Sequence, residues 1–498
     1  MLRFSVYDNG DASGRISIDG AYLVGSDGVP LRAEIEARDG EIVCTKRAPG
    51  PAGLAVLWPV KGGGRLLLES ARLPEQDKPY NLHLELARGR LMRIDHKRED
   101  WGLFDFPGVD PIDTELRRAR DLFVHALQSD DPRQAAAYAD DALQTAVVAG
   151  ERLSLFHADI FLTRRRQTHA FNRRPLGCVL DPANTSDAYR QRIREAFDFV
   201  HLPMLWRHIE PKEQEINWRS VDAWVEWLNR HKVPIMAGPL VSFQDGHLPD
   251  WLFIYEHDYD AIRNLIFEHV RRVVERYGKH VQRWVVVSGI HAANTLHFSF
   301  EQLMELTRVG ATLVKQLAPR STSLVDLTAP WGEYYSRNQR TIPPMLYADM
   351  AVQSGIGFDA FGMQFQFGPG LDGMFVRDMF QISSMIDRIG NLGKPLHITG
   401  AQVPSAVAAA DGGVWRQSWS EEVQARWLRE FFHTALSKPF VETITWRDLA
   451  DDASLAVIPS GGLIRADYSP KAAFEALLSL RHDILGAARK PPRQVEAT

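Results

Sequence analysis

The chain is poor in cysteine and has neither a long apolar run nor an excess of positive charge. Its 498 residues include only two cysteines, Cys44 and Cys178, and their spacing fits neither a zinc motif nor a disulfide framework. No stretch approaches about 18 consecutive apolar residues and residues 1–10 lack a signal pattern, so the sequence predicts a cytoplasmic protein without a membrane partner. The net charge of −5, without a concentrated basic tract, argues against a nucleic-acid partner.

The sequence also lacks the motifs of common cofactor sites. No Gly-rich phosphate loop follows the first strand of the α/β region, which disfavours the alternative of a doubly wound open sheet. His257, His291 and His297 have spacings that match no zinc pattern. We therefore expect no metal and no cofactor.

The first part of the chain predicts a β-sandwich followed by helices. Residues 1–108 contain short runs of alternating apolar and polar residues, such as 82–86, separated by Gly-containing turns. From 109 to 173 the apolar residues recur at helical spacing, which predicts a helical connector. Residues 488–498 show no periodicity and are interpreted as a tail.

Residues 174–487 predict an α/β fold, a (β/α)8 barrel. Eight apolar runs are strand candidates, at 177–180, 197–203, 234–241, 283–288, 323–327, 360–367, 395–400 and 441–446. An amphipathic helical stretch follows each of them, at 186–196, 219–231, 258–277, 299–317, 342–354, 375–389, 420–436 and 470–487. Functional residues of such a barrel lie at the C-terminal ends of its strands, so we expect the site in the segments that follow the strands.

Those segments are rich in aromatic and amide side chains. Eleven of the 13 tryptophans follow residue 200. Flat apolar rings and hydrogen-bonding amides are suited to sugars. We therefore predict a carbohydrate-binding site formed by Trp206, Asp245, His247, Trp251, Trp331, Gln364, Gln366, Gln402 and Trp446. Trp224, Trp227 and Trp427 have helical spacing instead, which indicates packing in the outer layer.

Several sequence segments match one family in the same order. They are W-R-H-I-E-P at 206–211, I-N-W at 216–218, L-P-D-W-L at 248–252, W-V-V-V-S-G at 284–289, G-M-Q-F-Q at 362–366 and P-K-A-A-F at 470–474. Together they resemble the motifs of glycoside hydrolase family 10, the retaining endo-β-1,4-xylanases. The resemblance extends over about residues 176–485 and implies a (β/α)8 barrel with a carbohydrate partner.

The resemblance fails at the two positions that carry the chemistry of this family. Retaining hydrolysis uses two carboxyl groups about 5–5.5 Å apart, one as acid/base and one as nucleophile. The residues that align with these two glutamates are Gly289 and Gly400. Glycine has no side chain to donate a proton or to attack a sugar. The resemblance therefore implies a barrel without its inherited catalytic pair.

Three functions remain open from the sequence. In the first, which we predict, the barrel binds carbohydrate without hydrolysing it. In the second, it hydrolyses O-glycosyl bonds with relocated carboxylates, Glu333 being paired with Asp326, Asp245 or Asp448. In the third, the protein is structural or interacts with other molecules through its N-terminal β-sandwich, which by analogy is compatible with an accessory carbohydrate-binding role.

Overall fold

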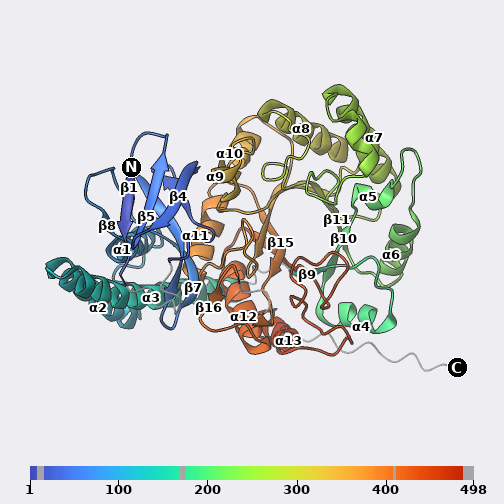
Figure 1. The fold of residues 1–498 in the computed structure, drawn as a ribbon. Coiled ribbons are helices and arrows are strands. Elements are labelled where there is room, and N and C mark those ends of the chain that lie inside the picture. The colour runs from blue at the N-terminus through green and yellow to red at the C-terminus, as the bar shows by residue number, and fades with distance from the viewer. Residues whose placement is uncertain (8–15, 169, 171–173, 408–410, 486–498) are drawn as a thin grey trace.

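The computed structural model describes residues 1–498 except 8–15, 169, 171–173, 408–410 and 486–498, so the predicted tail lies outside the described residues. Eight parallel strands close into a barrel (Figure 1). They are β9 (Leu176–Val179), β10 (Phe199–Pro203), β11 (Ile235–Gly238), β12 (Arg283–Ser288), β13 (Thr322–Leu327), β14 (Ala360–Gln366), β15 (Leu396–Gln402) and β17 (Val441–Trp446). Strand β17 pairs with β9 and closes the barrel, which confirms the predicted (β/α)8 fold and excludes an open doubly wound sheet.

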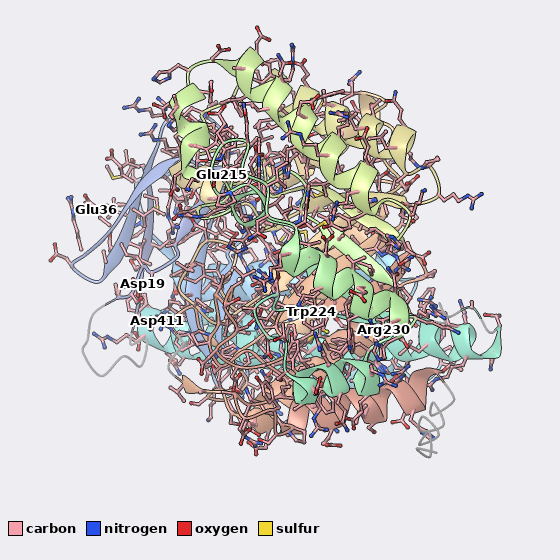
Figure 2. All side chains as sticks on the ribbon, turned by 90° about the vertical axis from the view of Figure 1, so that its right-hand side faces the viewer. Asp19, Glu36, Glu215, Trp224, Arg230 and Asp411 are labelled. Carbon is pink, nitrogen blue, oxygen red and sulfur yellow. The ribbon has the colours of Figure 1, made fainter. Side chains whose placement is uncertain are left out.

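Helices cover the outside of the barrel. The principal ones are α4 (Asp187–Ala196), α6 (Arg219–Arg230), α7 (Tyr259–Tyr277), α8 (Phe300–Leu317), α10 (Pro344–Gln353), α11 (Met379–Gly390), α12 (Glu421–Ser437) and α13 (Ala472–Leu485). Side-chain caps such as Ser299 before α8 and Asp378 before α11 satisfy free backbone N–H groups and so determine where these helices begin. On α6, Trp224 is buried whereas Arg230 is exposed at the surface (Figure 2), which confirms the packing predicted for Trp224.

Two small sheets lie beside the barrel. One contains β4 (Ala33–Arg38), β5 (Glu41–Lys46), β1 (Leu2–Ser5) and β8 (Tyr80–Asn81) in that order. The other contains β16 (Val414–Trp415), β7 (Gly64–Glu69), β6 (Ala52–Val60), β2 (Tyr22–Gly25) and β3 (Pro30–Leu31). Strand β16 comes from the loop that follows barrel strand β15, so the barrel supplies the edge strand of an N-terminal sheet.

Three long helices connect the sheets to the barrel: α1 (Leu82–Asp100), α2 (Asp110–Gln128) and α3 (Pro132–Gln167). The strand pattern predicted at 82–86 is therefore wrong. A five-residue alternation also places Leu82 and Leu86 four residues apart on one helical face, and both are buried. The Asn81 side chain caps this helix by accepting a hydrogen bond from the backbone N–H of His83. Among the described residues, no helix has the length and apolar sequence that crossing a membrane requires.

A buried guanidinium joins the barrel to the second sheet. Arg377, in the loop before α11, forms an ion pair with Glu333 at 2.7 Å, and both side chains are at most 1% exposed. Arg377 also donates to the Tyr22 hydroxyl and to the Leu67 carbonyl, each at 3.1 Å. Its guanidinium carbon lies 4.8 Å from the centre of the Trp331 ring. Because Glu333 follows β13 whereas Tyr22 and Leu67 belong to β2 and β7, one charge links both parts of the molecule.

Glu333→Gln should therefore destabilise the fold. The substitution leaves the buried Arg377 guanidinium without its paired carboxylate, and we expect the free energy of unfolding to fall by about 3 kcal/mol. Urea denaturation measures this loss. The matched control is Glu226→Gln, because Glu226 pairs with Arg230 at the surface and its side chain is 72% exposed; there we expect a change below about 0.5 kcal/mol. Equal effects of the two substitutions would contradict the role given to Glu333.

Candidate functional site

A cavity of about 540 Å³ opens at the C-terminal ends of the barrel strands. Each barrel strand contributes to its lining, seven of them from their last residues or the residue directly after and β15 from its middle: Val179, Pro203, Gly238, Ser288, Asp326, Gln366, Thr399 and Arg447. The volume lies in the range typical of small-molecule pockets, and the location is the one where (β/α)8 barrels place their sites. The cavity is therefore the candidate site.

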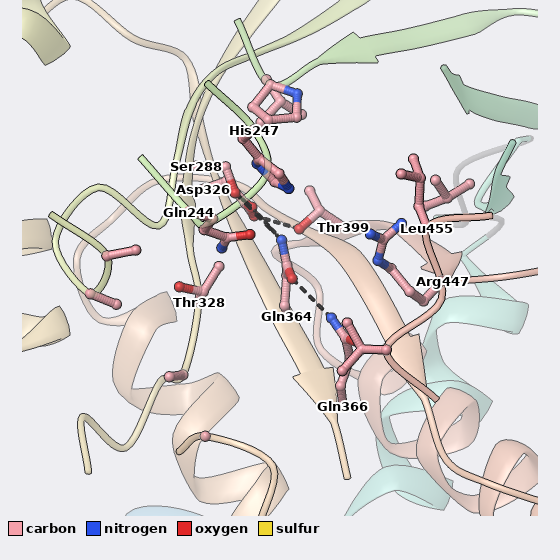
Figure 3. Close-up of a pocket in the computed structure, with 18 of the residues that line it drawn as sticks. Gln244, His247, Ser288, Asp326, Thr328, Gln364, Gln366, Thr399, Arg447 and Leu455 are labelled. Atoms are coloured by element: carbon pink, nitrogen blue, oxygen red, sulfur yellow. Dashed lines mark hydrogen bonds between the residues drawn. The ribbon is translucent and has the colours of Figure 1, made fainter. Parts of the chain in front are cut away.

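Asp326 is the centre of a hydrogen-bond network in this cavity (Figure 3). Ser288 Oγ and Gln364 Nε2 donate to Asp326 Oδ2 at 2.6 and 2.7 Å, and the Thr399 hydroxyl donates to Oδ1. Gln366 Nε2 in turn donates to Gln364 Oε1 at 3.0 Å. The four neighbouring strands β12, β13, β14 and β15 thus each supply a side chain, and Ser288 and Asp326 are paired in register.

Burial has the largest effect on the Asp326 carboxyl. The side chain is 1% exposed, and burial raises its pKa, while the hydrogen bonds from Ser288, Thr399 and Gln364 act in the opposite direction. Space for the carboxyl comes from Gly362 on the next strand, since a Cβ atom there would lie 2.3 Å from Asp326 Oδ1. The carboxyl is therefore fixed among neutral donors.

The two histidines in the cavity are neutral near pH 7. Burial, together with the nearby Arg447 guanidinium, lowers the pKa of both His201 and His247 to about 4. His247 Nδ1 lies 2.9 Å from Ser242 Oγ. Arg447 is consequently the only cationic side chain among the described residues that line the cavity. Within the described part of the chain, no group of three or more His, Cys, Asp and Glu side chains is placed to hold a metal ion.

The structure brings four of the nine predicted binding residues together with Asp326. Asp245, His247, Gln364 and Gln366 all line the cavity, with Asp245 exposed. The other five lie outside it: Trp206, Trp251, Trp331, Gln402 and Trp446. None of the described tryptophans lines the cavity, so the predicted tryptophan rings lie outside the candidate site.

The predicted tryptophans pack in the protein interior instead. Trp206 stacks on His269 with ring centres 4.4 Å apart and donates to the Glu210 carboxylate at 3.0 Å. Trp251 donates to the Glu210 carbonyl at 2.9 Å. Trp446 is fully buried and donates to the carbonyl of Gly461, also at 2.9 Å. Trp331 packs against Phe365 and Phe367. A position after a strand thus does not determine which way the ring points.

Two of the predicted carboxylates are also occupied elsewhere. Glu333 is held by Arg377, and Asp448 accepts a hydrogen bond from Gln402 Nε2 at 2.8 Å, with neither carboxylate lining the cavity. The hypothesis that Glu333 pairs with Asp326 across the cavity is therefore wrong. Arg447 and Thr399 also line the cavity without being among the predicted residues; Thr399 lies within the predicted strand 395–400, and Arg447 directly follows the one at 441–446.

The two glycines at the family's catalytic positions have different surroundings. Gly289 has φ +62, and a Cβ atom on it would lie 2.7 Å from Thr328 Oγ1 and 2.9 Å from Gln244 Nε2. At Gly400 a Cβ atom would meet Arg447 Cδ at 3.5 Å, which is an ordinary contact. A side chain is therefore disfavoured at 289 by backbone and space, whereas position 400 has room.

Comparisons with known proteins agree with the barrel. Residues 166–480 match the family model described as Glycosyl hydrolase family 10. Endo-1,4-beta-xylanase A of Halalkalibacterium halodurans is 30% identical over 132 residues, which cover 23% of this chain and 33% of that protein. The chain thus spans about a third of the length of this curated relative.

Solved structures give the same assignment of fold. Native xylanase 10B from Thermotoga maritima has a TM-score of 0.50 at 17% identity, over 64% of this chain and 98% of that one. Xylanase 10B from Thermotoga petrophila in complex with xylobiose has a TM-score of 0.48 at 16% identity, over 63% and 95% of the two chains. At such low identity, the likeness to the Thermotoga maritima structure shows the fold alone.

Alanine substitutions should separate the two glycine positions. Gly289→Ala forces a side chain into the left-handed region against Thr328, and we expect the free energy of unfolding to fall by about 1–2 kcal/mol. Gly400→Ala serves as the matched control, with stability unchanged or raised by up to about 1 kcal/mol. Thermal unfolding of both variants measures the difference. A Gly289→Ala variant as stable as the unsubstituted protein would refute the constraint at 289.

Proposed function

The chain belongs to glycosyl hydrolase family 10, and from this premise we propose that its barrel binds carbohydrate without hydrolysing it. The observation that carries the proposal is the glycine at each position that aligns with a catalytic glutamate of the family. Without side chains at 289 and 400, neither proton donation nor nucleophilic attack is available there. The left-handed backbone at Gly289 supports this proposal further, because a glutamate side chain would be strained in that conformation.

The chemistry of the cavity lining supports a ligand rich in hydroxyl groups. Gln244, Gln364 and Gln366 supply amides, and Ser288 and Thr328 supply hydroxyls. Gln366 Oε1 is buried and has no hydrogen-bond partner among the described residues, so the amide retains an unused acceptor. Because the relatives are named xylanases and one is in complex with xylobiose, xylo-oligosaccharides are the first ligands to test.

One observation favours hydrolysis as a second candidate function. Asp245, Asp326 and Asp372 all line the cavity, and burial raises the pKa of Asp326 in the direction that suits a proton donor. Asp372, however, already forms an ion pair with Arg337. The hydrolytic alternative is thereby reduced to Asp326 acting with Asp245.

Two further proposals rest on the sequence. One is a cytoplasmic location. The other is an accessory sugar-binding role for the N-terminal β-sandwich, for which no specific site has been identified. The experiments on the barrel described below test neither of these two proposals.

The proposal predicts binding without turnover. We expect calorimetry to detect binding of at least one sugar in a panel of xylo-oligosaccharides and other plant oligosaccharides, and chromatography to find no sugar released from them or from aryl glycosides. Gln364→Ala removes one of the cavity's hydrogen-bonding amides and should weaken binding about tenfold. Gln353→Ala is the matched control, because Gln353 lies on α10 and outside the cavity lining.

Two results would overturn the proposal. Release of sugar that Asp326→Asn abolishes would establish a hydrolase with a relocated carboxylate. Absence of any binding heat across the panel would favour a structural or interaction role.

A further inference from the structure

The guanidinium of Arg447 enters the cavity and has no hydrogen-bond or ion-pair partner among the described residues. Arg447 directly follows β17 and is partly exposed. Figure 3 shows its guanidinium end pointing toward Thr399. Within the described part of the chain, its side chain forms no hydrogen bond and no ion pair. This contrasts with Arg377, whose two terminal guanidinium nitrogens donate to Leu67, Tyr22 and Glu333 and so hold the two parts of the molecule together.

The carboxylates around Arg447 are held by other groups. Asp326 and Asp448 are near enough to interact with Arg447 electrostatically. Asp326 nevertheless accepts its hydrogen bonds from Ser288, Gln364 and Thr399, and Asp448 accepts its own from Gln402. The N–H donors of Arg447 therefore remain available to a ligand.

The other charged or titratable side chains that line the cavity do not pair with Arg447. Asp372 is paired with Arg337, and Asp245 is exposed, where water and salt screen its charge. His201 and His247 are neutral near pH 7 because burial lowers the pKa of each to about 4. Arg447 is thus the cation that a ligand meets inside this cavity.

The absence of a side chain at position 400 leaves space next to this cation. A Cβ atom on Gly400 would lie 3.5 Å from Arg447 Cδ and 3.6 Å from Gln366 Nε2. A glutamate at this position, as in the family motif, would bring a carboxylate close to Arg447. With glycine there, no side chain at position 400 competes for Arg447, whose own side chain has no hydrogen-bond or ion-pair partner among the described residues.

We propose that the cavity binds a carbohydrate bearing a carboxylate or sulfate group, with that group held by Arg447 in the space beside Gly400. The planar guanidinium can donate two parallel hydrogen bonds to either anion. This inference rests on the proposed carbohydrate binding and adds the chemical class of the ligand.

Matched disaccharides test the inference. Disaccharides that contain glucuronic, galacturonic or mannuronic acid are titrated by calorimetry, each beside its neutral counterpart and the 6-sulfated form of that counterpart. We expect at least one carboxylated or sulfated sugar to bind tenfold or more tightly than the neutral sugar of the same ring. The carboxylated and sulfated arms then identify which anion is recognised.

Variants connect this preference to Arg447. Arg447→Gln should bring the anionic sugar down to the affinity of its neutral counterpart, and Arg447→Lys should retain part of the preference. Gly400→Glu should also abolish the preference, because the new carboxylate would pair with Arg447, while Gly400→Ala controls for added bulk. Since Gly400→Glu leaves Arg447 itself in place, it gives an independent test if Arg447→Gln does not fold.

The outcomes separate this inference from the proposed function. If neutral sugars bind and no anionic sugar is preferred, the inference fails and carbohydrate binding stands. If no sugar of either kind binds, both fail. A preference that survives Arg447→Gln in a folded protein also overturns the role of Arg447.

Discussion

The carboxyl group of Asp326 is the interaction on which the cavity depends. Its two oxygens accept hydrogen bonds from strands β12, β14 and β15, while Asp326 itself belongs to β13. A buried carboxylate without these donors would cost several kcal/mol. The network therefore holds four adjacent strand ends in one arrangement, and it orients Gln364 and, through it, Gln366. This use as an acceptor argues that Asp326 positions the lining more than it exchanges protons.

The two positions that the resemblance aligns with the family's catalytic glutamates have different structural surroundings. At 289 the backbone is left-handed and Thr328 and Gln244 occupy the space of a side chain, so a glutamate there would require the loop to move. At 400 a Cβ atom would make only ordinary contacts of 3.5–3.6 Å. Restoring the catalytic pair would therefore need rebuilding of the loop after β12 in addition to two substitutions.

The sequence predicted the barrel closely because its signals are local. Strands β12 and β17 have the bounds that the apolar runs at 283–288 and 441–446 gave, since each run is bordered by clear changes in pattern. The alternation at 82–86 was misleading because five residues are too few to separate a strand from one face of a helix. Element type could thus be predicted wherever the periodic segment was long.

Side-chain partners were much harder to predict than strands. Glu333 pairs with Arg377, which stands 44 residues later, and Arg377 contacts Tyr22, which stands 355 residues earlier. Local sequence patterns cannot predict contacts between residues so far apart in the chain. The direction of a ring after a strand is likewise decided by packing, as Trp446 shows by turning toward the carbonyl of Gly461. The residues that line the cavity were found where the strand itself aims them inward, as at Gln364 and Gln366.

Arg447 differs from three buried carboxylates of the barrel, because those carboxylates have protein partners. Glu333, Asp326 and Asp448 are all buried carboxylates, and each has donors from the protein. Leaving a polar group unsatisfied in a water-poor space is costly, so folded proteins rarely do it. Arg447 lies in an open cavity, where water can solvate it until a ligand arrives, and its lack of a protein partner carries little penalty. An unpaired Arg447 beside Gly400 therefore costs little stability, and its guanidinium can bind an anionic group of a ligand.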